Sequence, residues 1–182
     1  MITACGSRRN NTTNEIFNLD QFITGQVEYL AKNQAELEKQ SGFGDTEEIV
    51  TLRHDSAAWA KELSLFRTAD IHKPGLRSFY EQEEYESGGD LVTEYELSDS
   101  TQSETINLRI IRSKETGNIV KIEALQHTRN PIYNSRRKLM MKFLPARDIE
   151  VRLDSFSVTG FQKMVIQDSV TYQSSGKILL TD

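Results

Sequence analysis

Residues 105–123 read TINLRIIRSKETGNIVKIE, and this stretch decides the class of fold. Two segments in which apolar and polar residues alternate, 105–112 and 119–126, flank the turn sequence Thr116-Gly117-Asn118. Alternation with a period of two is typical of β-strands with one buried face, and a short turn containing glycine joins antiparallel neighbours. The stretch therefore predicts a β-hairpin. The residues expected to face the core are Ile106, Leu108, Ile110, Val120 and Ile122.

The same alternation extends over most of the second half of the chain. A further strand is predicted at 136–144, where Leu139, Met141 and Phe143 face inward and Lys138 and Lys142 face outward. The short connections between the strands predict an antiparallel meander. A separate short strand is compatible with residues 46–52. The other predicted strands are 79–85, 91–97, 149–158 and 161–172.

The beginning of the chain carries helical periodicity instead. Apolar residues recur at helical spacing from Leu19 to Leu37, which predicts an amphipathic helix of roughly 22 residues. Asn18 is the expected N-cap, and Ser41-Gly42 the expected end. A second helix should begin at Asp55 or Ser56. Its buried residues are expected to be Trp59, Leu63 and Phe66.

These segments together predict an α+β fold. Two N-terminal helices pack on a curved antiparallel sheet of six or seven strands, either as a meander or as a half-open barrel. The chain has 182 residues, of which 37% are hydrophobic and 27% charged, as expected for one folded domain. That domain is predicted to span residues 15–182. No apolar run approaches the roughly 20 residues that a membrane-spanning helix needs.

Charge is distributed unevenly along the chain. Residues 1–104 hold 9 Lys/Arg and 20 Asp/Glu, whereas residues 105–182 hold 13 and 7, which gives −11 and +6 within a net charge of −5. We expect the two halves to neutralise each other across the sheet. The basic residues could alternatively bind an anionic partner, either lipid head groups or another envelope protein. Nucleic acid is not expected, because the basic strands lack aromatic platforms. The residues of this patch are Arg129, Arg136, Arg137, Lys138 and Lys142.

The only cysteine lies at position 5. Ile2-Thr3-Ala4-Cys5 resembles a bacterial lipobox, and this resemblance implies that Cys5 is lipidated and that residues 1–14 comprise a lipobox remnant and a flexible tether. Only four residues precede the cysteine, fewer than the apolar stretch of about 7–15 residues in a signal peptide. The interpretation therefore expects coding sequence before Met1. Without it, Cys5 would be a mobile thiol.

A longer resemblance covers most of the chain. Phe17-Asn18-Leu19, Trp59-Ala60-Lys61-Glu62-Leu63 with Phe66, and Asp70-Ile71-His72-Lys73-Pro74 are together similar to a group of small uncharacterised lipoproteins of Bacteroidetes-type bacteria. The resemblance implies a cell-envelope location, with a lipid anchor and Gly6 compatible with the outer membrane, facing the periplasm or the surface. It implies no catalytic residue.

Candidate catalytic and metal-binding residues are scattered. The three histidines, His54, His72 and His127, have no second ligand at metal-binding spacing, although His54 and His72 flank the second helix and could meet in space. The acidic run from Glu81 to Glu86 is interpreted as a solvated edge strand. No catalytic residue, cofactor or metal site is predicted, and the chain is not expected to be an enzyme.

Two functions from different classes fit these features. The first is a non-catalytic envelope lipoprotein that docks another protein. The second is a carrier or receptor for a lipid or another hydrophobic ligand held in a cavity of the sheet. The residues expected to line that cavity are Met141, Phe143, Phe156 and Phe161.

Overall fold

The computed structural model describes residues 16–43, 46–99, 102–164 and 169–180, so Cys5 and the predicted tether lie outside the described residues. The described part has an α+β fold with nine strands and three α-helices. The helices are α1 (Leu19–Lys32), α2 (Ser56–Glu62) and α3 (Ser64–Arg67), with a 3-10 helix η1 (Arg77–Phe79). The strands are β1 (Glu36–Phe43), β2 (Thr46–Arg53), β3 (Tyr80–Ser87), β4 (Asp90–Leu97), β5 (Thr105–Ser113), β6 (Ile119–Asn130), β7 (Tyr133–Pro145), β8 (Val151–Met164) and β9 (Val170–Leu179).

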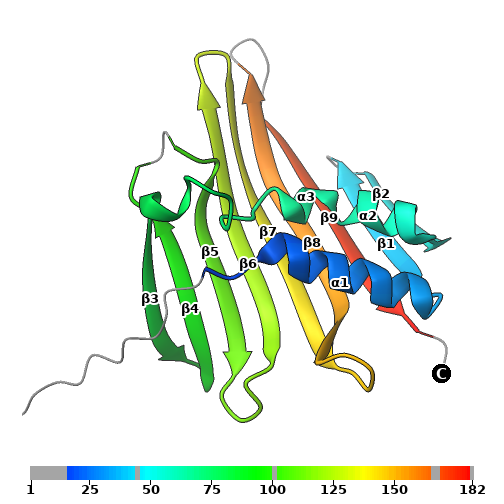
Figure 1. Cartoon of the computed structure of the whole chain (residues 1–182). Coiled ribbons are helices and arrows are strands. Elements are labelled where there is room, and N and C mark those ends of the chain that lie inside the picture. The colour runs from blue at the N-terminus through cyan, green and yellow to red at the C-terminus, as the bar shows by residue number, and fades with distance from the viewer. Residues whose placement is uncertain (1–15, 44–45, 100–101, 165–168, 181–182) are drawn as a thin grey trace, which may run out of the picture.

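All nine strands belong to one antiparallel sheet, in the order β2-β1-β9-β8-β7-β6-β5-β4-β3. From β3 to β9 the spatial order follows the chain, which confirms the predicted meander. The β1–β2 hairpin pairs with β9, so an N-terminal hairpin extends the C-terminal side of the sheet (Figure 1). The sheet is not closed: β2 and β3 are its two edges. The expected six or seven strands and two helices are therefore too few.

The three α-helices lie on the same side of the sheet (Figure 1), and the core lies between them and the strands. Asn18 and Asp55 cap α1 and α2 as predicted: each side chain accepts a backbone N–H bond, from Gln21 and Ala58. The buried side chains include the expected Trp59, Leu63 and Phe66. The helix-bearing side thus supplies one shared apolar core.

The predicted inward faces of the central strands are correct except at two bulges. Leu108, Ile110 and Ile122 are buried, as are the three predicted residues of β7. Ile106 and Val120 are only half-buried. Each is skipped in the β5–β6 pairing, where the register shifts, and a bulged residue is not aligned with either face.

The prediction of a single long N-terminal helix is wrong. Helix α1 ends at Lys32, Gln34 adopts a left-handed φ of 49°, and the chain turns into β1. Leu37 fits the helical spacing, but it also fits an alternation in which Leu37 is buried and Glu38 is exposed. Its strand environment opposite Ile178 buries it completely. Tertiary pairing therefore overrides the local helical pattern.

The last two predicted strands have different bounds. Strand β8 continues through Gly160 to Met164, and β9 begins only at Val170, so the prediction of a strand over 161–172 joins parts of two strands. A glycine inside a strand is tolerated when a neighbouring aromatic ring covers it. Tyr172 of β9 is paired with Gly160, and its ring provides that cover.

Helix α1 is fixed to the rest of the molecule by two buried polar side chains. Oδ1 of Asp70 accepts a bond from the backbone N–H of Leu19 at 3.1 Å. The amide of Gln26 bonds both backbone groups it meets on β8: Nε2 donates to the carbonyl of Val151 at 2.9 Å, and Oε1 accepts from the N–H of Leu153 at 2.6 Å. These bonds satisfy strand groups that would otherwise be buried without partners.

The acidic and basic halves of the chain form ion pairs across the sheet, as expected. Arg109 of β5 contacts Glu94 of β4, in the acidic half, at 3.9 Å, and it also contacts Glu123 of β6, in its own half, at 3.2 Å. Three further pairs join the halves, Lys114–Glu86, Arg137–Glu104 and Lys32–Asp148. Strand β3, with its run of glutamates, is an edge strand as predicted.

Replacing Gln26 by Met keeps the volume of the side chain and removes its two bonds. We expect the free energy of unfolding to fall by about 2–4 kcal/mol, because a buried carbonyl and a buried N–H each lose their partner. Chemical denaturation measures this change. The control is Gln21→Met on the exposed side of α1, which should stay within about 0.5 kcal/mol of the parent. Equal losses in the two variants would contradict the role of Gln26.

Replacing Tyr85 by Phe should raise the pKa of Glu94. The hydroxyl of Tyr85 donates to this carboxylate and is the largest cause of its lowered pKa. A carboxylate with a lowered pKa in the folded state stabilises the fold above its unfolded pKa, and this contribution is lost as pH falls through the folded pKa. Carboxyl NMR titration measures the shift. Tyr80→Phe, which removes a hydroxyl bonded to the carbonyl of Thr105, should leave the Glu94 titration unchanged.

Candidate ligand-binding cleft

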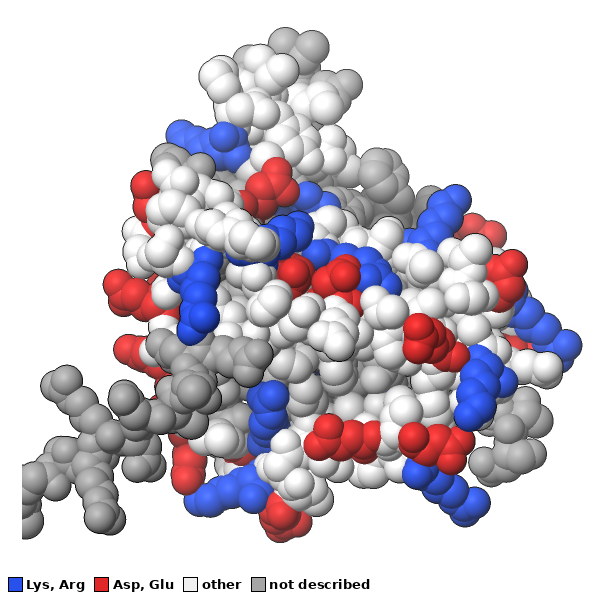
Figure 2. Space-filling view, viewed as in Figure 1, with Lys and Arg blue, Asp and Glu red and all other residues white. Residues whose placement is uncertain are grey.

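A cleft of about 680 Å³ opens on the helix-bearing side, between α2–α3 and strands β1, β9 and β8. One part of its wall is apolar and the other is charged. The apolar and aromatic residues are Ala58, Leu65, Phe66, Phe156, Val158 and Tyr172. Elsewhere on this side of the molecule acidic and basic side chains are interspersed, without a large area of one sign (Figure 2).

The floor of the cleft is made by two aromatic rings that lie over glycines of the adjacent strand. Phe156 of β8 is paired with Gly176 of β9, and a Cβ at residue 176 would lie 2.4 Å from Cζ of Phe156. In the reciprocal arrangement, a Cβ at Gly160 of β8 would lie 2.7 Å from the hydroxyl oxygen of Tyr172. Neither glycine can therefore carry a side chain without moving a ring. The absence of these side chains leaves space below α2 and α3.

Helix α3 closes the apolar end. Its Phe66 packs against Phe156 with ring centroids 5.6 Å apart and an interplanar angle of 73°, the edge-to-face arrangement that aromatic pairs prefer. Phe66 is buried, and Leu65 beside it is half-buried. Between the two glycine positions, Val158 and Ser174 are paired and complete the floor. This end can contact an apolar group.

The charged end is organised around Glu62 of α2. Nζ of Lys39 lies 2.7 Å from Oε1 and 3.0 Å from Oε2 of Glu62, so β1 and α2 are joined by one ion pair. Nε2 of His54 lies 3.9 Å from Oε2 of the same carboxylate and is buried without a hydrogen bond. The His54 ring packs edge-on against Trp59. Lys61 and Ser174 also line the cleft.

A second hollow meets the cleft at His54. It has a volume of about 560 Å³ and lies where α1 turns into β1, and its lining includes Asn33, Gln34, Arg53 and Asp55. His54 lines both spaces, so the amphipathic cleft and the polar hollow adjoin at this residue. The buried, unbonded Nε2 is thus located at the boundary between them.

The structure separates the residues predicted to line an apolar cavity. Met141 and Phe143 are buried in the core, and Phe143 packs against Phe22 of α1. Phe161 is half-buried. Phe156 alone of the four lines the cleft. Sequence reasoning could identify inward-facing residues, but it could not tell which of them the helices cover.

The basic patch is divided by the alternation of β7. Arg137 is on the helix-bearing side of the strand, 3.9 Å from Glu104, whereas Arg136 and Lys138 are on the open side. Lys138 lies 3.2 Å from Glu123. Lys142 is on the open side as well, and Arg129 is exposed near the end of β6. Four of the five predicted residues therefore remain on one side.

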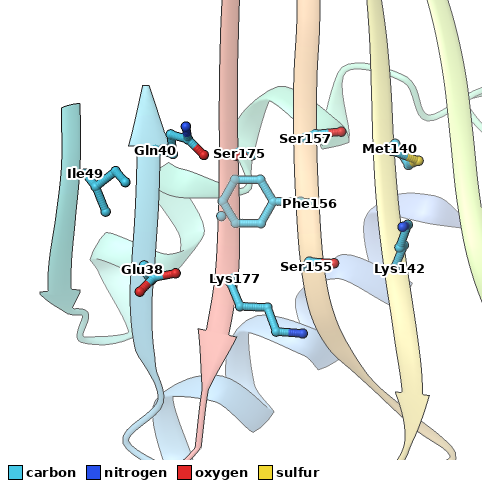
Figure 3. A pocket seen from close by; sticks show the side chains of 11 residues that line it. Glu38, Gln40, Ile49, Met140, Lys142, Ser155, Phe156, Ser157, Ser175 and Lys177 are labelled. Atoms are coloured by element: carbon cyan, nitrogen blue, oxygen red, sulfur yellow. The ribbon is translucent and has the colours of Figure 1, made fainter. Parts of the chain in front are cut away.

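A shallower hollow of about 270 Å³ lies on the open side (Figure 3). Its floor consists of small residues, Ser155 and Ser157 of β8 and Ser175 of β9, and taller side chains border them. Lys177 extends over this floor and binds Asp154 at 2.7 Å. Phe156 borders both this hollow and the helix-side cleft.

The histidines do not form a shared site. His54 lies in the cleft, His72 is exposed, and His127 of β6 bonds Asn134 of β7 through Nε2 at 3.0 Å. Within the described ranges, no group of three or more His, Cys, Asp or Glu residues is arranged to hold a metal ion. None of the described helices is long and apolar enough to cross a membrane.

The residues of the charged end were not predicted as a group. Lys39, His54 and Glu62 are separated in the sequence, and the erroneous helix placed Lys39 on the wrong type of element. A usable signal was the pair of glycines within strand sequence at 160 and 176, because such glycines often mark a close approach of another group. Comparison of the chain with protein-family models, with curated proteins and with solved structures finds no match.

Proposed function

We propose that this chain is a non-catalytic binding protein that holds one small molecule with an apolar part in the cleft between α2–α3 and the sheet. The observation that carries the proposal is the cleft itself, with aromatic rings on its floor and fixed charges at one end. Its volume of about 680 Å³ is within the range of roughly 300–1,000 Å³ that is usual for small-molecule sites. The ligand is a lipid or another molecule small enough to fit a cleft of this volume.

The architecture of the floor supports reversible binding. Phe156 and Tyr172 are held in place by strand pairing and by the glycines beneath them, so little ordering is needed when a ligand enters. A preformed apolar surface retains more of the gross binding energy, because fewer side chains lose freedom on association. The Lys39–Glu62 ion pair fixes the position of α2 over this surface.

The proposal includes a location in the cell envelope. Its support is the lipobox-like sequence that ends at Cys5 and the polar stretch after it. Lipidation of Cys5 would hold the folded domain close to a bilayer, most simply the outer membrane, while the tether lets the cleft remain accessible. A ligand with an acyl chain is abundant at such a surface.

Docking of another envelope protein is the second candidate, and the open side of the sheet favours it. The hollow in Figure 3 combines polar floor residues with the apolar Met140 and Ile49, and Ile49 on the edge strand is 64% exposed. Arg136, Lys138 and Lys142 lie on the same side and would suit an acidic partner. In this alternative the cleft would have no ligand.

Replacing Ala58 by Trp tests the ligand-binding proposal, because Ala58 lines the cleft and the indole would fill part of it. We expect the affinity for the uncharged fluorescent probe N-phenyl-1-naphthylamine to fall at least about tenfold, equivalent to about 1.4 kcal/mol. Fluorescence titration of residues 14–182 measures this, with native mass spectrometry for any ligand that copurifies.

The matched control is Ala57→Trp, which adds the same side chain to the exposed neighbouring position of α2. It should bind the probe within about twofold of the parent. Thermal melts establish that both variants are folded. If the parent fails to bind the probe, or if both variants bind it equally well, the cleft is not the site and protein docking becomes the better account.

A further inference from the structure

We propose that the ligand of the cleft carries an anionic head group, and that Lys61 is the residue that selects it. This inference rests on the proposed function and specifies the chemical class of the ligand. The class is a single-chain amphiphile whose head is a carboxylate or a phosphate. Lys61 lies on α2, at the charged end of the cleft, and the apolar floor extends from there toward Phe66.

The charges around the cleft leave one cation uncompensated. Glu62 is the only carboxylate among the described residues that line it, and both oxygens of Glu62 lie within 3.0 Å of Nζ of Lys39. The acidic residue is therefore already neutralised. Within the described part of the chain, the ammonium group of Lys61 has no ion pair or hydrogen bond, and it is exposed at the cleft. Two lysines and one glutamate leave a formal excess of one positive charge.

The Lys39–Glu62 ion pair also sets the polarity of the site. Lys39 is only 27% exposed and Glu62 only 15%, so their attraction is weakly screened and Glu62 is not available to a cationic ligand. Nε2 of His54 lies 3.9 Å from Oε2 of the same carboxylate. No other described residue of the cleft wall carries a carboxylate.

The two ends of the cleft match the two ends of an amphiphile. An acyl chain over Phe156 and Val158 would be removed from water, while the head would remain at the exposed ammonium of Lys61. Ammonium groups bind carboxylates and phosphates through charge-assisted hydrogen bonds, which are stronger than neutral ones. A cationic head in the same place would meet Lys61 and gain no partner. The arrangement therefore favours an anion.

The experiment uses four ligands that share a twelve-carbon chain. Dodecanoate, dodecyl phosphate, dodecanol and dodecylammonium are titrated below their micelle concentrations against residues 14–182 loaded with N-phenyl-1-naphthylamine, and displacement gives each dissociation constant. We expect both anions to bind at least about tenfold more tightly than dodecylammonium. The affinity of dodecanol should lie between that of the anions and that of dodecylammonium. The ratio of the dissociation constants of dodecanoate and dodecyl phosphate shows whether the site prefers a carboxylate or a phosphate head group.

Lys61→Glu should remove the preference for anions or reverse it, while dodecanol binds within about twofold of the parent. Lys61→Gln provides a variant without the added negative charge and should bring the anions close to dodecanol. The matched control is Lys73→Glu, because Lys73 is exposed and does not line the cleft and its replacement changes the net charge equally. It should keep the preference of the parent.

The possible failures are distinguishable. If no twelve-carbon ligand displaces the probe, including dodecanol, the proposed function fails. If dodecanol binds but the anions gain nothing over dodecylammonium, ligand binding stands and the assignment of the head group is overturned. An equal loss of preference in Lys61→Glu and Lys73→Glu would mean that net charge, rather than Lys61, attracts the anion.

Discussion

Nine strands at their usual spacing of about 4.8 Å extend over about 38 Å, and the longest helix that covers them is only about 21 Å long. The remaining structure depends on this mismatch, because the apolar side of the sheet has to be shielded by three short helices. Helix α1, fixed to β8 by Gln26, covers the centre. Helices α2 and α3 extend the cover toward β9 and β1 but leave a gap. The cleft is the part of the apolar side that the helices do not fill.

The gap is kept open by residue size as much as by helix length. Strands β8 and β9 place glycines and a serine where larger side chains would reach up to α2 and α3. The aromatic rings of Phe156 and Tyr172 lie across these positions instead of rising from the sheet. These two pairs of an aromatic residue and a glycine, Phe156–Gly176 and Tyr172–Gly160, therefore give the cleft a flat floor below α2 and α3. The charged end differs, because Lys39 of β1 forms an ion pair with Glu62 and so connects the sheet to α2.

The class of fold could be predicted from the sequence, because the alternation of apolar and polar residues along a strand depends only on residues close together in the chain. Leu108, Ile110 and Ile122 are recognisable as buried from their neighbours alone. Leu37 is not, because its spacing satisfies a helix and a strand equally, and only its distant partner Ile178 decides between them. Ile106 and Val120 show the same limit, since a bulge depends on the partner strand. The cleft was still less accessible to prediction, because it combines His54 with residues from β1, α2, α3, β8 and β9.

The pairing of β1 with β9 sets the order in which the molecule can assemble. Strand β1 lies near the beginning of the chain and β9 near its end, so this contact closes a loop that contains the whole meander. Such distant contacts are costly in entropy and form late, whereas the hairpins from β3 to β8 can form as each strand emerges. The cleft needs both β1 and β9. Its walls are therefore complete only after the last strand has joined the sheet.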